Sequence, residues 1–293
     1  MLKGVKHYDF PLKSIKINSV LFIMELINKK YLILNKIGSG SFGSIFKGQN
    51  VRTKEFVAIK VERINDELKL LKNESKIYQY LNDCSGIPSV KWFGKDDNNY
   101  YMVIDLLGNS LQELKNKLSS FSLALVLKIG VKIILLLKTI HEKGLVHRDI
   151  KPDNFLFGQN KLTDLYLIDF GLCKTYLDND IHIPIKSTHS IIGSFNYASI
   201  MSHKRIDLSR RDDLESVGYM LLYFISDNLP WNNESDENEI IKKKLEILNN
   251  NRYPHILLDF LRYVRSLEYE EKPNYYLIID NFKREIDLLS KIN

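Results

Sequence analysis

Three polar side chains near the middle of the chain have the chemistry to hold a metal ion together with the phosphates that it carries. Asp149 and Asn154 stand five residues apart in the run from His147 to Asn154, and Asp169 follows an apolar run and directly precedes a Phe-Gly pair. Magnesium takes one or two carboxylate or amide oxygens and leaves its other positions to water and phosphate oxygens. We therefore expect Asn154 and Asp169 to bind the metal, which leaves Asp149 to orient a substrate hydroxyl and accept its proton.

A glycine-rich turn earlier in the chain is a candidate phosphate-binding element. It comprises Ile37, Gly38, Ser39, Gly40, Ser41, Phe42, Gly43, Ser44 and Ile45. Glycines let the backbone approach phosphates and adopt positive φ without a Cβ clash. A strand rather than a helix is expected to follow and Gly-Lys-Ser/Thr is missing, so the turn is neither a dinucleotide fingerprint nor a Walker loop. On its own, this spacing is also compatible with an ordinary hairpin.

A lysine after the glycine turn strengthens the phosphate-binding interpretation. Lys60 ends the apolar run 56–60, which also contains Ala58. At this interval its ammonium group is expected where the phosphates would lie. Because a buried ammonium needs a partner, we expect Glu74 on the following helix to pair with it. Together the two side chains would orient the α- and β-phosphates of a nucleotide.

The distribution of apolar residues predicts a β-rich part followed by a helical part. Short apolar runs with Gly- and Asn-containing breaks predict antiparallel strands at residues 31–34, 45–47, 56–60, 90–93 and 100–104. Residues 66–81 have helical spacing, and the pattern is mainly helical beyond residue 108. We expect one domain over residues 24–293, with a small lobe at 24–106 and a large lobe at 107–293. Residues 1–23 are expected to be an extension, either disordered or upstream of a true start at Met24.

The composition bounds the class of protein and its surroundings. With 293 residues, 44% hydrophobic and 27% charged, the chain has the make-up of a globular protein. The longest apolar run, residues 123–140, contains three lysines and therefore predicts a buried helix rather than a membrane span. Two cysteines give neither a zinc pattern nor a disulfide framework. Since the N-terminus has no signal-peptide layout, we expect a cytoplasmic protein, with nuclear or virion locations also open.

The run that ends at Asn154, followed by Asp-Phe-Gly, resembles the catalytic loop and metal-binding motif of the eukaryotic protein kinases. This resemblance implies a bilobal α+β fold, with an antiparallel β-sheet and one helix in the small lobe and a mainly α-helical large lobe. It implies ATP and Mg²⁺ as cofactors, and adenine binding by the backbone at Asp105 and Leu107. It also implies that Lys151 contacts the transferred phosphoryl group, which favours serine or threonine of protein substrates as the acceptor.

The end of the expected activation segment points to one branch of the kinases. Residues 193–200 stand where most kinases have Ala-Pro-Glu, and no Pro-Glu is found there. With the downstream pair Asp212-Asp213, this pattern resembles the casein kinase I family of Ser/Thr kinases. The resemblance implies acidic or phosphorylated substrates, and support of the catalytic loop by Asp213 from a buried helix. Asn196 replaces a family arginine that helps hold an anion, so we expect a weakened preference for phosphorylated substrates unless Lys186, His189 or Lys204 compensates.

Two other classes of function remain open. A kinase-fold scaffold would bind nucleotide or protein partners with little turnover, but Lys60, Asp149, Asn154 and Asp169 are all present. A nucleic-acid-binding module is suggested only by the net charge of +6, without a zinc, RNP-type or basic-aromatic pattern. We expect a monomer that acts on proteins, without nucleic-acid or membrane partners. Because the chain ends soon after the last expected helix, we also expect activity without phosphorylation of the activation segment.

Overall fold

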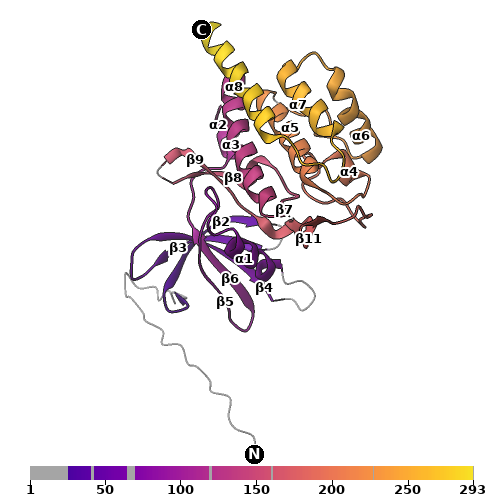
Figure 1. Ribbon diagram of the computed structural model, residues 1–293. Coiled ribbons are helices and arrows are strands. Elements are labelled where there is room, and N and C mark those ends of the chain that lie inside the picture. The colour runs from indigo at the N-terminus through magenta and orange to yellow at the C-terminus, as the bar shows by residue number, and fades with distance from the viewer. Residues whose placement is uncertain are drawn as a thin grey trace, which may run out of the picture. The chain divides into compact units, whose positions relative to one another are not determined.

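The computed structural model describes residues 26–40, 43–64, 70–118, 121–159, 161–226 and 228–292. The expected extension at residues 1–23 and the start at Met24 lie outside these ranges. The described chain divides into two compact units, one formed from its residues up to Leu71 with Val90–Leu106 and the other from Lys72–Ser89 with its residues from Leu107 on. The first unit is built on a β-sheet and the second is mainly helical (Figure 1).

The first unit contains a six-stranded antiparallel sheet in the order β1-β2-β3-β4-β6-β5. The strands are β1 (Leu26–Ile27), β2 (Tyr31–Gly40), β3 (Gly43–Asn50), β4 (Phe56–Arg63), β5 (Val90–Lys95) and β6 (Asn99–Asp105). All five predicted runs lie within these strands, which confirms the predicted antiparallel sheet. Strand β4 is central, with Lys60 opposite Ile45 of β3 and Met102 of β6.

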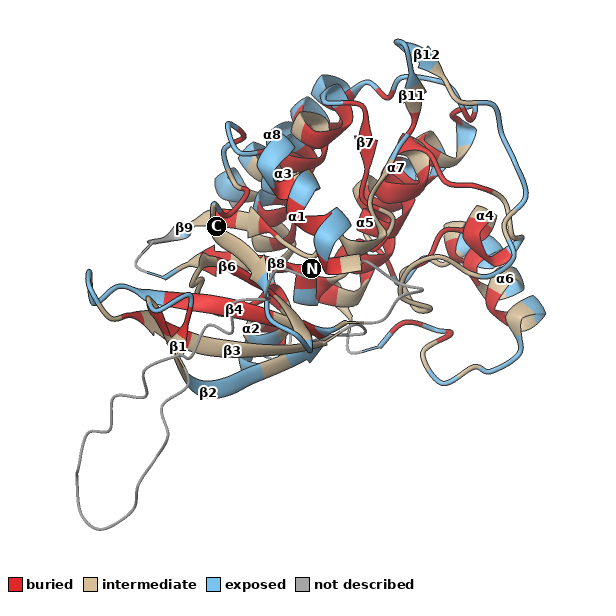
Figure 2. Ribbon diagram, turned by 90° about the horizontal axis from the view of Figure 1, so that it is seen from below, coloured by how far each residue is buried: buried red, intermediate tan, exposed pale blue. Residues whose placement is uncertain are grey.

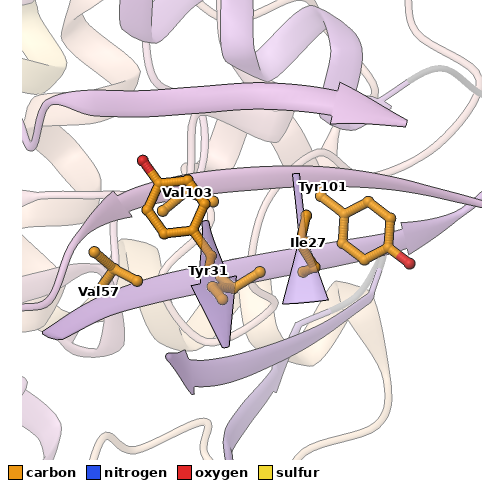
Figure 3. Close-up of a cluster of buried hydrophobic side chains, with 6 residues drawn as sticks. Ile27, Tyr31, Val57, Tyr101 and Val103 are labelled. Atoms are coloured by element: carbon orange, nitrogen blue, oxygen red, sulfur yellow. The ribbon is translucent and has the colours of Figure 1, made fainter. Parts of the chain in front are cut away.

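A compact apolar cluster holds this sheet together (Figure 3). Its buried members are Ile27, Tyr31, Val57, Ile59, Tyr101 and Val103. Val57 and Ile59 project from the same face of β4, as the two-residue period of a strand requires. The phenol of Tyr101 donates a hydrogen bond to Asp96 Oδ2 at 2.6 Å, so its polar tip is satisfied while the ring packs in the core. This packing fixes the register of β4 and with it the position of Lys60.

Helix α1 (Leu70–Tyr80) begins in the first unit and continues into the second. It lies within the predicted helix 66–81, of which residues 66–69 are outside the described ranges. The backbone N–H of Leu71 donates to Glu62 Oε2 at 2.9 Å. A carboxylate at this end satisfies one of the free N–H groups of the first turn.

Besides most of α1, the second unit contains seven helices of the described chain. They are α2 (Leu111–Leu118), α3 (Leu123–Glu142), α4 (Ile200–His203), α5 (Arg210–Ile225), α6 (Glu237–Glu246), α7 (His255–Ser266) and α8 (Tyr275–Ile292). Helix α3 packs on α5 and α8, and α5 packs on α7. Almost every residue of α5 is buried (Figure 2). This burial makes α5 a rigid support for the segments that contact it.

Helix α3 confirms the prediction of a buried helix over the longest apolar run. Ten of its residues are buried, whereas Lys128 and Lys132 are exposed at its edge. None of the helices in the described ranges has the length and apolar character needed to cross a membrane.

Short strands complete the second unit and shape its loops. They are β7 (Leu145–Val146), β8 (Phe155–Gly158), β9 (Lys161–Leu167), β10 (Lys174–Thr175), β11 (Leu177–Asp178) and β12 (Ile181–His182). Strand β7 pairs with β10, β8 with β9 and β11 with β12. The β8–β9 hairpin pairs Phe155 with Leu167, so the residues just before β8 lie next to those just after β9. This hairpin thus brings Asn154 and Asp169 to the same place.

Candidate active site

The loop between β7 and β8 is anchored to helix α5 by a single carboxylate. Asp213 Oδ2 accepts from His147 N at 2.7 Å, and Oδ1 accepts from Arg148 N at 2.8 Å. His141 Nε2 lies 2.9 Å from Oδ2. Burial raises the pKa of Asp213, but the hydrogen bond and charge of His141 outweigh it, and the pKa is lowered overall. The ionised carboxylate holds Arg148 in a left-handed backbone conformation with φ 69°.

Asp149 follows directly, and both of its carboxylate oxygens are engaged. Oδ1 accepts from Ser194 N at 2.8 Å and from Ser194 Oγ at 2.7 Å. Oδ2 accepts from Lys151 Nζ at 2.6 Å and from Asn154 Nδ2 at 3.3 Å. The residue is only 7% exposed, so these donors fix the carboxylate in one orientation. A carboxylate oriented in this way can align a hydroxyl group and accept its proton.

Asn154 and Asp169 lie side by side and offer oxygen donors. Asn154 Nδ2 donates to the carbonyl of Asp149 at 2.8 Å, which leaves the amide oxygen to face away from that carbonyl. Ile168 N donates to Asn154 O at 3.0 Å, so the next residue, Asp169, lies beside Asn154. Asp169 has φ 67°, and its N–H donates to Tyr78 Oη at 3.1 Å. One amide and one carboxylate suit Mg²⁺, which would take its other ligands from water and phosphate.

Aromatic rings fix the backbone around Asp169. Phe170 is buried and meets Tyr78 edge-on at 5.0 Å between ring centroids, and it meets His147 at 5.1 Å. His147 Nε2 lies 3.1 Å from the carbonyl oxygen of Ile168. The three rings therefore connect α1, the catalytic loop and the Asp-Phe-Gly run within the second unit.

Ser194 contacts Asp149 because the preceding glycine lets two segments approach closely. Gly193 has φ 90°, and a Cβ atom there would lie 2.5 Å from Arg148 O. A side chain would be strained by both the backbone conformation and this contact. The sequence-based site did not include Ser194, although a glycine before a serine was a signal for a close approach.

Asp207 is a second residue that sequence reasoning missed. Its Oδ1 lies 3.6 Å from Arg148 Nη1, and its Oδ2 lies 2.5 Å from Lys174 Nζ. One carboxylate thus joins the cation of the catalytic loop to a cation just after the Asp-Phe-Gly run. No local pattern marked Asp207, because its partners are 33 and 59 positions away in the chain.

In the first unit, the glycine turn joins β2 to β3. The registered pairs are Gly38–Ile45, Ser39–Ser44 and Gly40–Gly43, while Ile37 is exposed; Ser41 and Phe42 lie outside the described residues. A Cβ atom at Gly43 would lie 2.1 Å from Val61 O of β4. Only glycine allows β3 to lie this close to β4, and this close pairing brings the turn to the strand that carries Lys60.

The other predicted residues of the first unit lie on neighbouring strands. Lys60 and Ala58 are both buried on β4, at 8% exposure. Asp105 ends β6 opposite Val57, and its carboxylate binds Lys91 Nζ at 2.8 Å. The Asp105 side chain is therefore used within the sheet, and its predicted contact with adenine would be made by the backbone.

Two predicted pairs combine residues from both units. Glu74 is buried in the part of α1 that belongs to the second unit, whereas Lys60 belongs to the first. Leu107 likewise belongs to the second unit and Asp105 to the first. The Lys60–Glu74 ion pair and the adenine site at Asp105 and Leu107 stay predictions.

Comparison with known families agrees with this arrangement. The model of the protein kinase domain matches residues 31–277, which is well over half of the chain. The matched range contains every candidate site residue. Members of this family transfer a phosphoryl group from ATP to protein substrates and commonly use a divalent metal ion. The six-stranded antiparallel sheet and the helical unit are the two parts of that α+β fold. The chain therefore belongs to the protein kinase family.

Proposed function

We propose that this kinase is a serine/threonine kinase of the casein kinase I type, which transfers the γ-phosphoryl group of ATP to acidic proteins with the help of Mg²⁺. The observation that carries the proposal is the oriented carboxylate of Asp149, beside the oxygen donors of Asn154 and Asp169. This combination suits transfer to a hydroxyl group, because the acceptor must be aligned and the phosphate charge neutralised.

Each side chain has a distinct part in the proposed reaction. Asp149 aligns the acceptor hydroxyl and takes its proton. Lys151, whose Nζ lies 2.6 Å from Asp149 Oδ2, approaches the transferred phosphoryl group and compensates its charge. Asn154 and Asp169 would hold Mg²⁺, which supplies positive charge to the phosphate oxygens when bound.

The surroundings of Asn196 indicate that a phosphate on the substrate is bound only weakly there. Asn196 Nδ2 donates to Asn232 Oδ1 at 2.6 Å, so this position offers a neutral amide that is already paired. Lys243 Nζ, in α6, binds Glu234 Oε2 at 2.7 Å. The neutral amide of Asn196, and Lys243 with its charge balanced by Glu234, attract a phosphate less than an unpaired arginine would. We therefore propose that unphosphorylated acidic proteins are the substrates.

The first experiment measures transfer from labelled ATP·Mg²⁺ to casein by the wild type and by Asp149→Asn. The variant keeps an oxygen for Ser194 but cannot accept a proton, so transfer should fall by several orders of magnitude in a protein that is still folded, which a melting curve checks. Equal transfer by both proteins would refute the role of Asp149. No transfer by the wild type, with ATP still bound, would favour the scaffold function instead.

A second arm tests the substrate class with two acidic peptides that differ only in an upstream phosphoserine. We expect kcat/KM values within a few-fold of each other, because Asn196 is paired with a neutral side chain. A rate gain of about 100-fold from the phosphoserine, which is close to 3 kcal/mol, would contradict the proposal.

A further inference from the structure

Lys244 in α6 is buried in a way that its sequence neighbours are not. It is 0% exposed, whereas Lys242 next to it in the same lysine run has a side chain that is 59% exposed. In the described part of the chain no carboxylate forms an ion pair with Lys244. A buried ammonium without a paired carboxylate is costly, so its contacts must compensate through hydrogen bonds and rings.

The three N–H donors of the Lys244 ammonium match three acceptors. Nζ lies 2.6 Å from Ala198 O, 3.3 Å from Phe195 O and 3.0 Å from His203 Nε2. Two aromatic faces complete the surroundings, with Nζ at 4.7 Å from the ring centroid of Tyr219 and 5.2 Å from that of Trp231. Burial, and then the charge of Lys244, lower the pKa of His203 to about 4, so its imidazole is neutral, and Nε2 accepts in the tautomer that carries its proton on Nδ1.

The carbonyl groups bound by Lys244 belong to the segment that begins at Ser194. Trp231 Nε1 donates to the carbonyl of Asn196 at 2.8 Å, between the two carbonyls that Lys244 binds. The N–H groups of Tyr197 and Ala198 donate back to Ser194 O at 2.9 and 2.8 Å, which closes a turn. Ser194, at the head of this turn, makes the two hydrogen bonds to Asp149 Oδ1. A continuous chain of contacts thus links α6 to the candidate proton acceptor.

We propose that Lys244 is a positioning residue, which holds the turn 194–198 through its three N–H donors and thereby keeps Ser194 on Asp149. The inference rests on the proposed phosphoryl transfer, because this turn begins at the group that orients Asp149. A neutral amine has only two N–H groups, so His203 Nε2–H would have to donate to its lone pair, and the bonds to the two carbonyls would lose the strength that the charge gives them. The charged form is therefore the one that holds the turn more strongly.

Several charged or titratable groups face Lys244 from the helices around it. His203 comes from α4, Glu215 and Tyr219 from α5, and Arg265 from α7. Burial lowers the pKa of Lys244 to about 7, although the charge of Glu215 acts in the opposite direction. Loss of the proton near neutral pH should therefore loosen the turn. The same loss removes a buried charge, so the free energy of unfolding should not fall with it.

The test compares Lys244→Met with Lys242→Met, which removes an exposed lysine from the same helix. Amide hydrogen exchange of Tyr197 and Ala198 and the kinetics of casein phosphorylation are measured on the full chain. We expect at least tenfold faster exchange of these two amides in Lys244→Met, together with lower kcat/KM for casein and an unchanged KM for ATP. Lys242→Met should behave as the wild type.

A second measurement needs no variant and applies even if Lys244→Met fails to fold. In the wild type, exchange protection of Tyr197 and Ala198 should decrease between about pH 6 and about pH 9, while amides in the middle of α5 keep theirs. Unchanged protection over this range, or equal exchange in the two variants, would overturn the inference. Because hydrogen exchange does not require turnover, this result is independent of whether the protein transfers phosphate.

Discussion

Asp213 shows how one buried carboxylate can set the geometry of a loop. Its two oxygens accept from two successive backbone N–H groups, those of His147 and Arg148, and it also meets the imidazole of His141. The hydrogen bonds to all three partners are strengthened by the negative charge of this buried carboxylate. The orientation of Asp149, the next residue along the loop, is therefore set by a side chain 64 positions away that takes no part in the reaction.

Replacing Asp213 by Asn should destabilise the protein strongly at neutral pH. The amide presents an NH₂ group where an oxygen accepted, so a buried hydrogen bond is lost and His141 loses its charged partner. We expect the free energy of unfolding to fall by about 1–3 kcal/mol at pH 7, the cost of leaving a buried N–H group without its acceptor, which urea denaturation would measure. Asp280→Asn, at an exposed position on α8, is the control and should change the stability by less than about 0.5 kcal/mol.

The difference in the free energy of unfolding between the wild type and Asp213→Asn should become smaller as the pH falls. The pKa of Asp213 is lower in the folded protein than in the unfolded chain, so its contribution is complete above the unfolded value of about 4 and is lost as the pH falls through the folded value. Burial also lowers the pKa of His141, so acid favours the unfolded chain in which this residue is protonated. The gap between wild type and Asp213→Asn should narrow in acid. If the stability difference stayed constant from neutral to acidic pH, the charge of Asp213 would not be the cause of the difference.

At the scale of elements, the sequence predicted the strands, helices and loops whose structure depends on residues close together in the chain. Strand β4 follows from the short apolar run 56–60, and α3 follows from a long apolar run with lysines at its edge. The residues around Asp149 were predicted because the catalytic loop is one continuous string. The paired β8–β9 hairpin then brings Asp169 to Asn154, which their expected role as ligands of one metal ion already suggested.

Contacts between distant segments could not be predicted in the same way. The lysine run in α6 has the composition of a solvated face, yet Lys244 is completely buried, because the aromatic rings of Tyr219 and Trp231 come from elsewhere in the fold. Ser194 and Asp207 also acquire their roles only when the segment after Asp169 folds back on the catalytic loop. Propensity and periodicity describe local structure and contain no information about contacts between segments that are distant in the chain.

At the scale of the whole molecule, the net charge of +6 bears on the proposed substrates. The chain has 42 Lys and Arg residues against 36 Asp and Glu residues, and a sequence pI near 9.0. A positive protein attracts acidic partners over distances of about a Debye length, which is about 10 Å at 0.1 M salt. This attraction acts on encounter, so it should affect the apparent affinity for an acidic protein more than the rate of the bound complex.

Salt should therefore affect the binding of an acidic substrate and the chemical step differently. Between about 20 mM and about 200 mM NaCl, KM for an acidic protein such as casein should rise several-fold while kcat changes little, because salt screens long-range attraction but not the buried contacts of Asp149. Steady-state kinetics at constant pH and free Mg²⁺ would measure both constants. A serine peptide of zero net charge is the control, and its KM should be almost independent of salt. If KM for both substrates rose equally, salt would be acting on the site itself, and the preference for acidic proteins would lose its electrostatic basis.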